Sequence, residues 1–168
     1  DYLLDRKIFF ENENYIFSYS NCDVFFEKSG RNEIHSKAPL PSGKIYDELA
    51  KNYSVRVSSL IVRKNSLKEI NFFDPNFNII GDFDAVMKLS KIGDAYPIQK
   101  PLLCVRIHGK NFLDKNRKML FDEFYRWFFN QIQDDYFRRN KILFLKKLIY
   151  YYFVSLFPKF LKDFFKKK

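Results

Sequence analysis

The chain has 168 residues, of which 46% are hydrophobic and 20% aromatic. This composition excludes an intrinsically disordered protein, and the length suits one domain with a substantial core. The formal net charge of +10 is uneven, because residues 138–168 carry +9 and residues 1–137 carry only +1. The basic character therefore belongs to the C-terminal segment and not to the body of the protein.

The first sixty residues alternate helical and extended patterns. Residues 2–12 predict a helix, residues 14–30 an aromatic-rich extended segment, and residues 39–54 a turn followed by a short helix. The β-branched run 55–63 predicts a buried strand. The apolar stripe expected on the first helix consists of Leu3, Leu4, Ile8 and Phe9.

The middle of the chain continues this alternation. Ser66 and Glu69 have the spacing of a capping box, so a short helix should begin there. Residues 82–94 predict a helix of about three turns that Gly93 closes as a left-handed cap, and residues 95–109 predict an extended segment broken by two prolines. The alternating order indicates an α/β protein.

The remaining elements are helical. Apolar residues recur every three or four positions over 119–137, which predicts an amphipathic helix that packs on the body. Cys22 and Cys104 lie far apart in extended runs, and we expect reduced core thiols of a cytosolic protein. The first residues contain acids and no long apolar stretch, so no signal peptide is expected, and the absence of an initiator Met predicts that an upstream part is missing.

Two carboxylates, Asp82 and Asp84, stand at the start of the helix predicted for residues 82–94. An aspartate there accepts a hydrogen bond from an exposed amide and interacts favourably with the positive end of the helix dipole, so capping explains either one. A carboxylate in the same place also serves as a general base. The residues by themselves leave both roles open.

The order of the motifs resembles the C-terminal, acceptor-binding half of a family 2 glycosyltransferase with the GT-A fold. The resemblance is carried by "FFDPNFNIIGDFDAVMKLS" and "KPLLCVRIHGKN", preceded by "VSSLIVRKNSLKEINFFD", and it covers roughly residues 1–130. It implies an inverting enzyme that transfers a sugar from a nucleotide-sugar donor to a saccharide or lipid-linked acceptor. The half that binds the donor is expected to be missing, so this chain alone should be inactive.

Residue by residue, the resemblance implies distinct roles at the start of this helix. Asp82 matches the second acid of the family's E-D motif and is the expected general base. Gly81 stands where the family usually has the first acid, which puts the acceptor contacts in doubt. Asp84 matches a supporting position, and capping remains its main interpretation.

A second group matches the side of the site that binds the donor. Arg106 and His108 correspond to the family's R-x-H, near the diphosphate, and Asp1 to the acid that often follows its metal-binding D-x-D. A divalent metal, Mg or Mn, is implied for the complete enzyme. Other interpretations are a salt bridge for Arg106 and a partly buried histidine for His108. His35 has no partner at metal-ligand spacing, and no zinc site is specified.

The segment Glu123–Trp127, "EFYRW", is similar to the Q-x-x-R-W motif of processive polysaccharide synthases. It has Glu in place of Gln and lies within the aromatic stripe of a predicted helix. A processive enzyme is therefore the less favoured interpretation.

The C-terminal segment combines aromatic and aliphatic residues with lysines. Its apolar run from Leu148 to Phe157 is too short to cross a bilayer, which needs about 20 residues. The pattern predicts a helix at the surface of an anionic membrane, or a helix that packs on another part of the protein. The residues expected to contact lipid are Lys146, Lys147, Lys159, Phe160, Lys162, Phe164 and Phe165.

Three regions are therefore expected: an acceptor-side GT-A part over 1–118, a packing helix over 119–137, and a membrane-interface tail over 138–168. The predicted fold class is α/β, a partial GT-A-like sheet with flanking helices and a C-terminal helical extension. The predicted location is peripheral, on the cytoplasmic face of the cell membrane, in cell-surface polysaccharide synthesis. The alternative is a non-catalytic module that binds membranes or nucleic acid, although nucleic acid is not the expected partner.

Overall fold

The computed structural model describes residues 2–109 and 111–156 and has mixed α/β architecture, as the alternating pattern predicts. Its strands are β1 (Tyr15–Phe26), β2 (Arg31–Ile34), β3 (Ile61–Val62) and β4 (Asp94–Ile107). Its α-helices are α1 (Lys7–Glu11), α2 (Tyr46–Lys51), α3 (Lys64–Glu69), α4 (Gly81–Ile92), α5 (Phe112–Lys115), α6 (Arg117–Asn130) and α7 (Asp135–Leu156). Two 3₁₀ turns, η1 (Leu4–Arg6) and η2 (Val57–Ser59), complete the elements.

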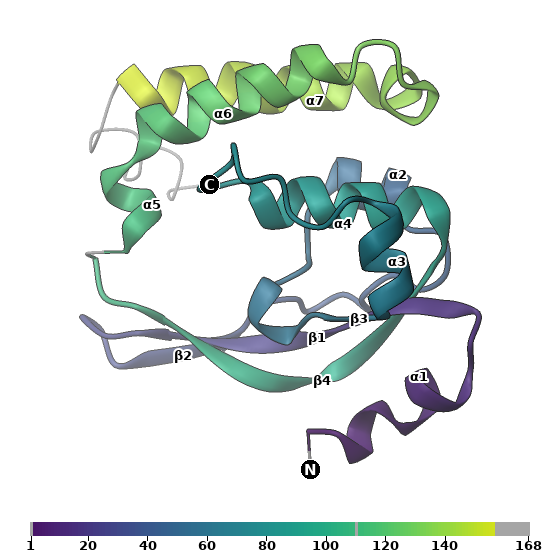
Figure 1. Cartoon of the computed structure of the whole chain (residues 1–168). Helices are drawn as coiled ribbons and strands as arrows, with labels where there is room; N and C mark the ends of the chain where they lie inside the picture. Colours follow the sequence, from purple (N-terminus) through teal and green to yellow (C-terminus); the bar gives the residue numbers. More distant parts are fainter. Residues whose placement is uncertain (1, 110, 157–168) are drawn as a thin grey trace.

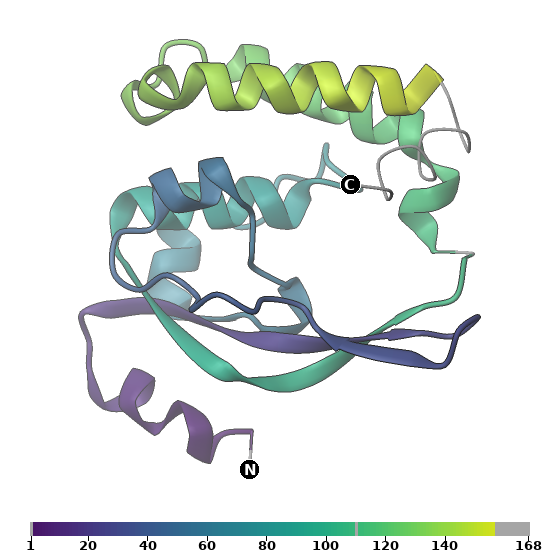
Figure 2. The ribbon, with the colours of Figure 1, turned by 180° about the vertical axis from the view of Figure 1, so that it is seen from behind.

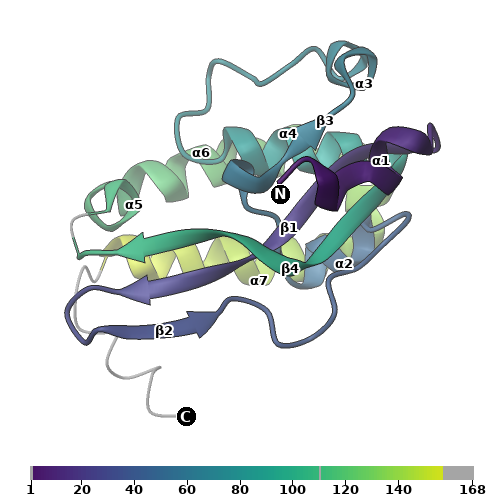
Figure 3. The same ribbon diagram turned by 90° about the horizontal axis from the view of Figure 1, so that it is seen from below.

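The long strand β1 is the centre of an open four-stranded sheet. β4 runs parallel to it from Tyr15 to Phe26, while β2 and β3 pair antiparallel with opposite ends of β1. Because β4 occupies one edge of β1 along its whole length, β2 and β3 must share the other edge, as Figure 3 shows for β2. β4 is thus an edge strand, which is where its two prolines are tolerated.

The helices form layers on the sheet. α2, α3 and α4 cover one face, α6 and α7 lie across α4 as an outer layer, and α1 lies on the opposite side of the sheet (Figures 1 and 2). Aromatic rings join the layers: Trp127 of α6 meets Phe83 of α4 edge to face at 4.9 Å and Phe144 of α7 at 5.1 Å. Each such buried side chain contributes about 1.5–3 kcal/mol to stability.

The chain reverses sharply between α4 and β4. Gly93 alone separates them, and a Cβ atom there would lie 2.8 Å from the side chain of Ile16 on β1. Its φ of −167° is extended backbone, so the expected left-handed cap is wrong and the glycine is needed for close approach. As a result, α4 runs over the face of the sheet in the direction opposite to β1 and β4.

Several expectations about local structure are corrected. α3 begins at Lys64 with Arg63 as its N-cap, so Ser66 lies inside the helix and forms no capping box. Run 55–63 is a 3₁₀ turn followed by a two-residue strand, because its backbone bends to pair with only the start of β1. On the first helix, Leu3, Leu4 and Ile8 are exposed and only Phe9 of the expected stripe is buried.

The C-terminal half also differs from expectation. The helix expected over 119–137 is two helices, because the chain turns after Asn130 and α7 begins at Asp135. The segment from residue 138 to Leu156 belongs to α7, whose inner face packs into the same core as α2 and α6. Cys22 is buried as expected, whereas Cys104 is exposed on the edge strand.

The loop that leads into α4 is held by α6. The carboxylate of Glu123, only 1% exposed, accepts hydrogen bonds from the backbone N–H groups of Asn78, Ile79 and Ile80 at 2.8–3.1 Å. Arg126 donates to the carbonyl oxygen of Asn76 at 3.3 Å. Together with Trp127, whose partner on α4 is described below, Glu123 and Arg126 form what we call the α6 clamp.

Replacing Glu123 by alanine should lower the free energy of unfolding by about 2–4 kcal/mol, because three backbone N–H groups lose a charged acceptor. Urea denaturation at neutral pH measures the change. Its exposed neighbour Asp122 provides the matched control, since Asp122→Ala removes the same charge without a buried partner. Equal stability of the two variants would show that the clamp does not hold the loop.

Candidate functional site

The two aspartates of α4 have different surroundings. Asp84 is 1% exposed, its Oδ2 lies 2.6 Å from the Nζ of Lys88, and its Oδ1 accepts a hydrogen bond of 3.1 Å from the indole Nε1 of Trp127. Oδ2 is thus paired within α4, and Oδ1 fixes α4 against α6. Asp84 therefore supports the packing of α4 on α6, and its partner Trp127 belongs to the α6 clamp.

Asp82 has no cation or side-chain donor as a direct partner among the described residues. It is partly buried in the first turn of α4, and its Oδ1 accepts a hydrogen bond of 2.8 Å from the N–H of Phe83. Burial raises the pKa of Asp82, although the N–H groups of Phe83 and of Asp82 itself, and the positive charge of Arg56, act in the opposite direction. A carboxylate with a raised pKa and no ion pair is suited to accept a proton.

Tyr53 and Arg56 lie beside Asp82, and the sequence analysis did not single out either residue. The Tyr53 ring packs edge to face on Phe83 at 5.2 Å. Burial, with the negative charge of Asp82, raises the pKa of Tyr53 well above 10. The one available signal was a charged residue, Arg56, inside a run otherwise expected to form a buried strand.

Arg56 also meets His35, for which the sequence indicated no partner. The Nη2 of Arg56 lies 3.2 Å from the Nδ1 of His35, and the backbone N–H of His35 donates to the carbonyl oxygen of Cys22 on β1 at 2.8 Å. Burial and the adjacent guanidinium lower the pKa of His35, so the imidazole is neutral at pH 7. We call Asp82, Tyr53, Arg56 and His35 the Asp82 site.

Gly81 is the first residue of α4 and has no positive φ. A Cβ atom there would meet Phe77 at an ordinary distance of 3.8 Å. The backbone therefore does not require glycine at this position, and an acid would fit where the resembled family has one.

Arg106 and His108 do not join the Asp82 site. α4 spans about 18 Å at 1.5 Å per residue, whereas the 14 residues of β4 extend about 46 Å. The two elements meet at Gly93, and α4 runs back along β4 (Figure 1). These lengths therefore place the start of α4 near the middle of β4, and the end of β4, which carries Arg106, on the order of 20 Å further along.

Local contacts explain much of the surroundings of Arg106 and His108. Arg106 is exposed and pairs with Glu27, and the side chain of Asn111 bridges the N–H of His108 and the carbonyl oxygen of Arg106. Asp1 lies outside the described residues. Within 2–109 and 111–156, no three His, Cys, Asp or Glu side chains gather as a metal site, so the described residues by themselves do not fit the implied Mg or Mn.

The lysines named for membrane contact on α7 point in different directions. Lys146 is exposed. Lys147 faces inward instead, where it donates to the carbonyl oxygen of Leu49 at 3.4 Å, and burial lowers its pKa to about 8. The other residues expected to contact lipid, which are Lys159, Phe160, Lys162, Phe164 and Phe165, lie outside the described residues.

The outward face of α7 is apolar. Ile142, Leu145, Ile149, Phe153 and Leu156, all exposed, recur at helical spacing and form what we call the outer stripe. Arg138, Lys141 and Lys146 flank it, and no acidic residue occurs between 136 and 156. In the described part of the chain, no helix contains a stretch with the length and apolarity needed to traverse a bilayer.

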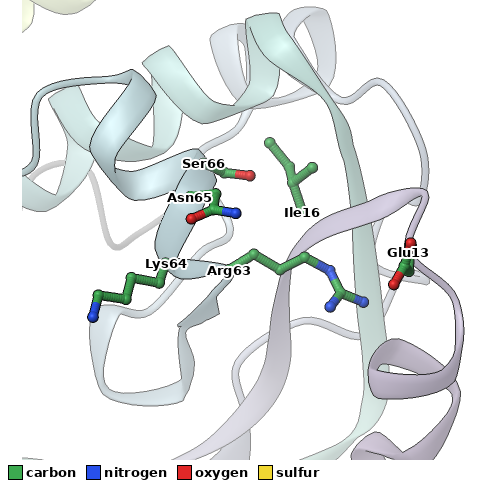
Figure 4. A pocket seen from close by; sticks show the side chains of 6 residues that line it. All are labelled: Glu13, Ile16, Arg63, Lys64, Asn65 and Ser66. Atoms are coloured by element: carbon green, nitrogen blue, oxygen red, sulfur yellow. The ribbon is translucent and has the colours of Figure 1, made fainter.

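An open depression lies beside the start of β1 (Figure 4). The contacts of its arginine have a structural role. Its lining residues are Glu13, Ile16, Arg63, Lys64, Asn65 and Ser66. The guanidinium of Arg63 donates to the carbonyl oxygens of Tyr15, Phe9 and Asn12 at 2.7–3.0 Å. Its donors thus tie α1 to the start of β1, and we assign no chemistry to this depression.

Comparison of the chain with protein-family models, with curated proteins and with solved structures found no match.

Asp82→Asn should leave the free energy of unfolding at pH 7 unchanged or higher. Folding raises the pKa of Asp82, so its ionisation costs stability above that pKa, and the cost fades as pH falls toward the unfolded value. Any gain from asparagine should thus disappear near pH 3. Asp84→Asn, which leaves Lys88 without its partner, should lower stability by about 3 kcal/mol at pH 7. Urea denaturation at both pH values measures this, and similar losses for the two variants would contradict the distinction.

Proposed function

We propose that this chain is the acceptor-side part of an inverting glycosyltransferase, with Asp82 as the general base. The observation that supports the proposal best is the contrast within α4. The carboxylate of Asp84 is held by Lys88 and Trp127, whereas Asp82 has a raised pKa and no ion pair among the described residues. The motif order around α4 and β4 supports the same assignment.

The chemistry places specific demands on this carboxylate. A hydroxyl of the saccharide or lipid-linked acceptor attacks the anomeric carbon of the donor sugar, its proton passes to Asp82, and the bond to the nucleoside diphosphate oxygen breaks. Burial favours proton uptake because it destabilises the charged form of Asp82. The α6 clamp keeps the first turn of α4 in place, which serves the orientation that such a transfer needs.

The donor side of the reaction is a separate part of the proposal. Arg106 and His108 are too far from Asp82 to act on the same proton, so in this scheme they would act toward the nucleotide-sugar diphosphate. An Arg is suited to that task because its planar guanidinium binds phosphate through two hydrogen bonds. A divalent metal would stabilise the leaving diphosphate in the complete enzyme.

We also propose that the outer stripe lies on the anionic, cytoplasmic surface of a membrane. An apolar face of a helix with basic residues along its sides inserts into the headgroup region, and each Lys or Arg near the surface contributes about 1 kcal/mol. The charge of residues 138–168 favours an anionic partner. Nucleic acid remains the alternative, although the aliphatic members of the stripe offer no stacking surface for bases.

In the protein of natural length, Asp82→Asn should reduce transfer by about 10²–10⁴-fold while the protein still binds nucleotide-sugars, because asparagine cannot take up the proton. Release of nucleoside diphosphate from UDP-, GDP- and dTDP-sugars, with a membrane extract as acceptor, measures transfer. Asp84→Asn is the matched control and should lose activity only in proportion to the fraction unfolded. Near-normal turnover of Asp82→Asn would assign Asp82 to helix capping.

Ile149→Glu should weaken binding to phosphatidylglycerol vesicles by at least about tenfold, because a charge replaces an inserted aliphatic side chain. Lys146→Gln should weaken it about fivefold. Lys147→Gln is the control, since Lys147 faces inward and its loss should leave vesicle binding unchanged. Vesicle flotation over a salt series, in parallel with binding to RNA and DNA oligonucleotides, decides between the two partners. Equal flotation of all three variants, or binding to oligonucleotides only, would contradict the membrane proposal.

A further inference from the structure

Three arginines from the N-terminal half approach the sheet, and two of them use their donors within the protein. Arg6 is fully buried and donates to the carbonyl oxygen of Ser59 at 2.5 Å and to the hydroxyl of Ser18 at 2.6 Å. Arg63 donates to three backbone carbonyl oxygens. Both arginines are therefore part of the scaffold.

Arg56 makes no such bond to a carbonyl oxygen in the described part of the chain. Its Nη2 lies beside the imidazole of His35, and the Cys22 thiol is within hydrogen-bonding reach of its guanidinium. Its Nε, like that of Arg6, is buried without a hydrogen-bond partner among the described residues. No described carboxylate forms an ion pair with Arg56, and the neutral ring of His35 cannot offset its charge. A partly buried guanidinium with unused N–H groups costs free energy unless an acceptor satisfies it.

A second unused donor lies on the same short segment. The hydroxyl of Tyr53, three residues before Arg56, is buried and has no hydrogen-bond partner within residues 2–109 and 111–156. The Tyr53 ring packs on Phe83, the residue that follows Asp82, and the charge of Asp82 acts on the Tyr53 hydroxyl. The first turn of α4 is thus adjacent to two unsatisfied donors, one of them cationic.

We propose that Arg56 and the hydroxyl of Tyr53 bind a negatively charged substituent, a carboxylate or a phosphate, on the molecule whose hydroxyl Asp82 deprotonates. A guanidinium and a phenol are both donors that suit an oxyanion, and a planar guanidinium binds one through two parallel hydrogen bonds. The role of that molecule as acceptor rests on the proposed function. The binding of the anion does not.

The test measures binding to the full 168-residue chain, which needs no transfer reaction. Three probes are titrated against the NMR signals of the Arg56 Nε–H and the His35 ring: inorganic phosphate, methyl glucuronide and methyl glucoside. We expect an anion to shift both signals and the neutral glucoside to shift neither. Phosphate and glucuronide as separate arms show which oxyanion the site prefers.

Arg56→Gln should weaken anion binding about 10- to 100-fold, and Tyr53→Phe should weaken it less, because the phenol carries no charge. Arg31→Gln is the matched control, since it removes one exposed positive charge that is already paired with Glu33. If Arg56→Gln does not fold, Arg56→Lys, which keeps the charge but loses the planar fork, takes its place.

The outcomes separate this inference from the proposed function. Failure of both anions to shift the wild-type Arg56 and His35 signals would overturn the anion site, whatever the activity of Asp82→Asn. Equal weakening by Arg56→Gln and Arg31→Gln would also overturn it, because general charge would then explain the binding. Anion binding that depends on Arg56 in this chain, together with no sugar transfer by the protein of natural length, would support the site and refute the transferase.

Discussion

The carboxylate of Glu123 determines where α4 begins, because it gathers three successive backbone N–H groups of the preceding loop. An unpaired buried carboxylate would be costly, so the loop and α6 stabilise each other. Trp127, one turn further along α6, fixes α4 through Asp84. The position and direction of Asp82 follow from these two contacts.

The Asp82 site and the scaffold around it differ in how their polar groups are satisfied. Asp84 is held by Lys88 and Trp127, and Arg63 by three carbonyl oxygens. Among the described residues, buried polar atoms without partners occur singly in the scaffold, at Arg6, Tyr46 and Ser54, whereas Tyr53 and Arg56 bring two of them beside Asp82. Unsatisfied polar groups of this kind are a cost to stability, which is why their concentration beside a carboxylate of raised pKa points to a binding role.

The C-terminal helices connect this site to the surface. α7 buries Phe137 and Phe144 against Trp127, and the same helix presents the outer stripe to solvent. A helix that buries one face in the core and exposes an apolar opposite face has a surface on which a partner can pack. Since α6 carries the clamp and α7 packs on α6, such a partner would lie one helical layer away from α4.

The sequence by itself determined the α/β class and the elements β1, α4 and β4, because local periodicity and turn residues suffice for long segments. It failed for the short run 55–63, where pairing with β1 overrides a weak local signal, and for Ser66, because α3 already begins at Lys64. It named Asp82 and Asp84 but left their roles open. Only the tertiary structure distinguished the surroundings of the two aspartates and added Arg56 to the site. The partners on which this rests, Trp127 and His35, come close to Asp84 and Arg56 only when the chain folds.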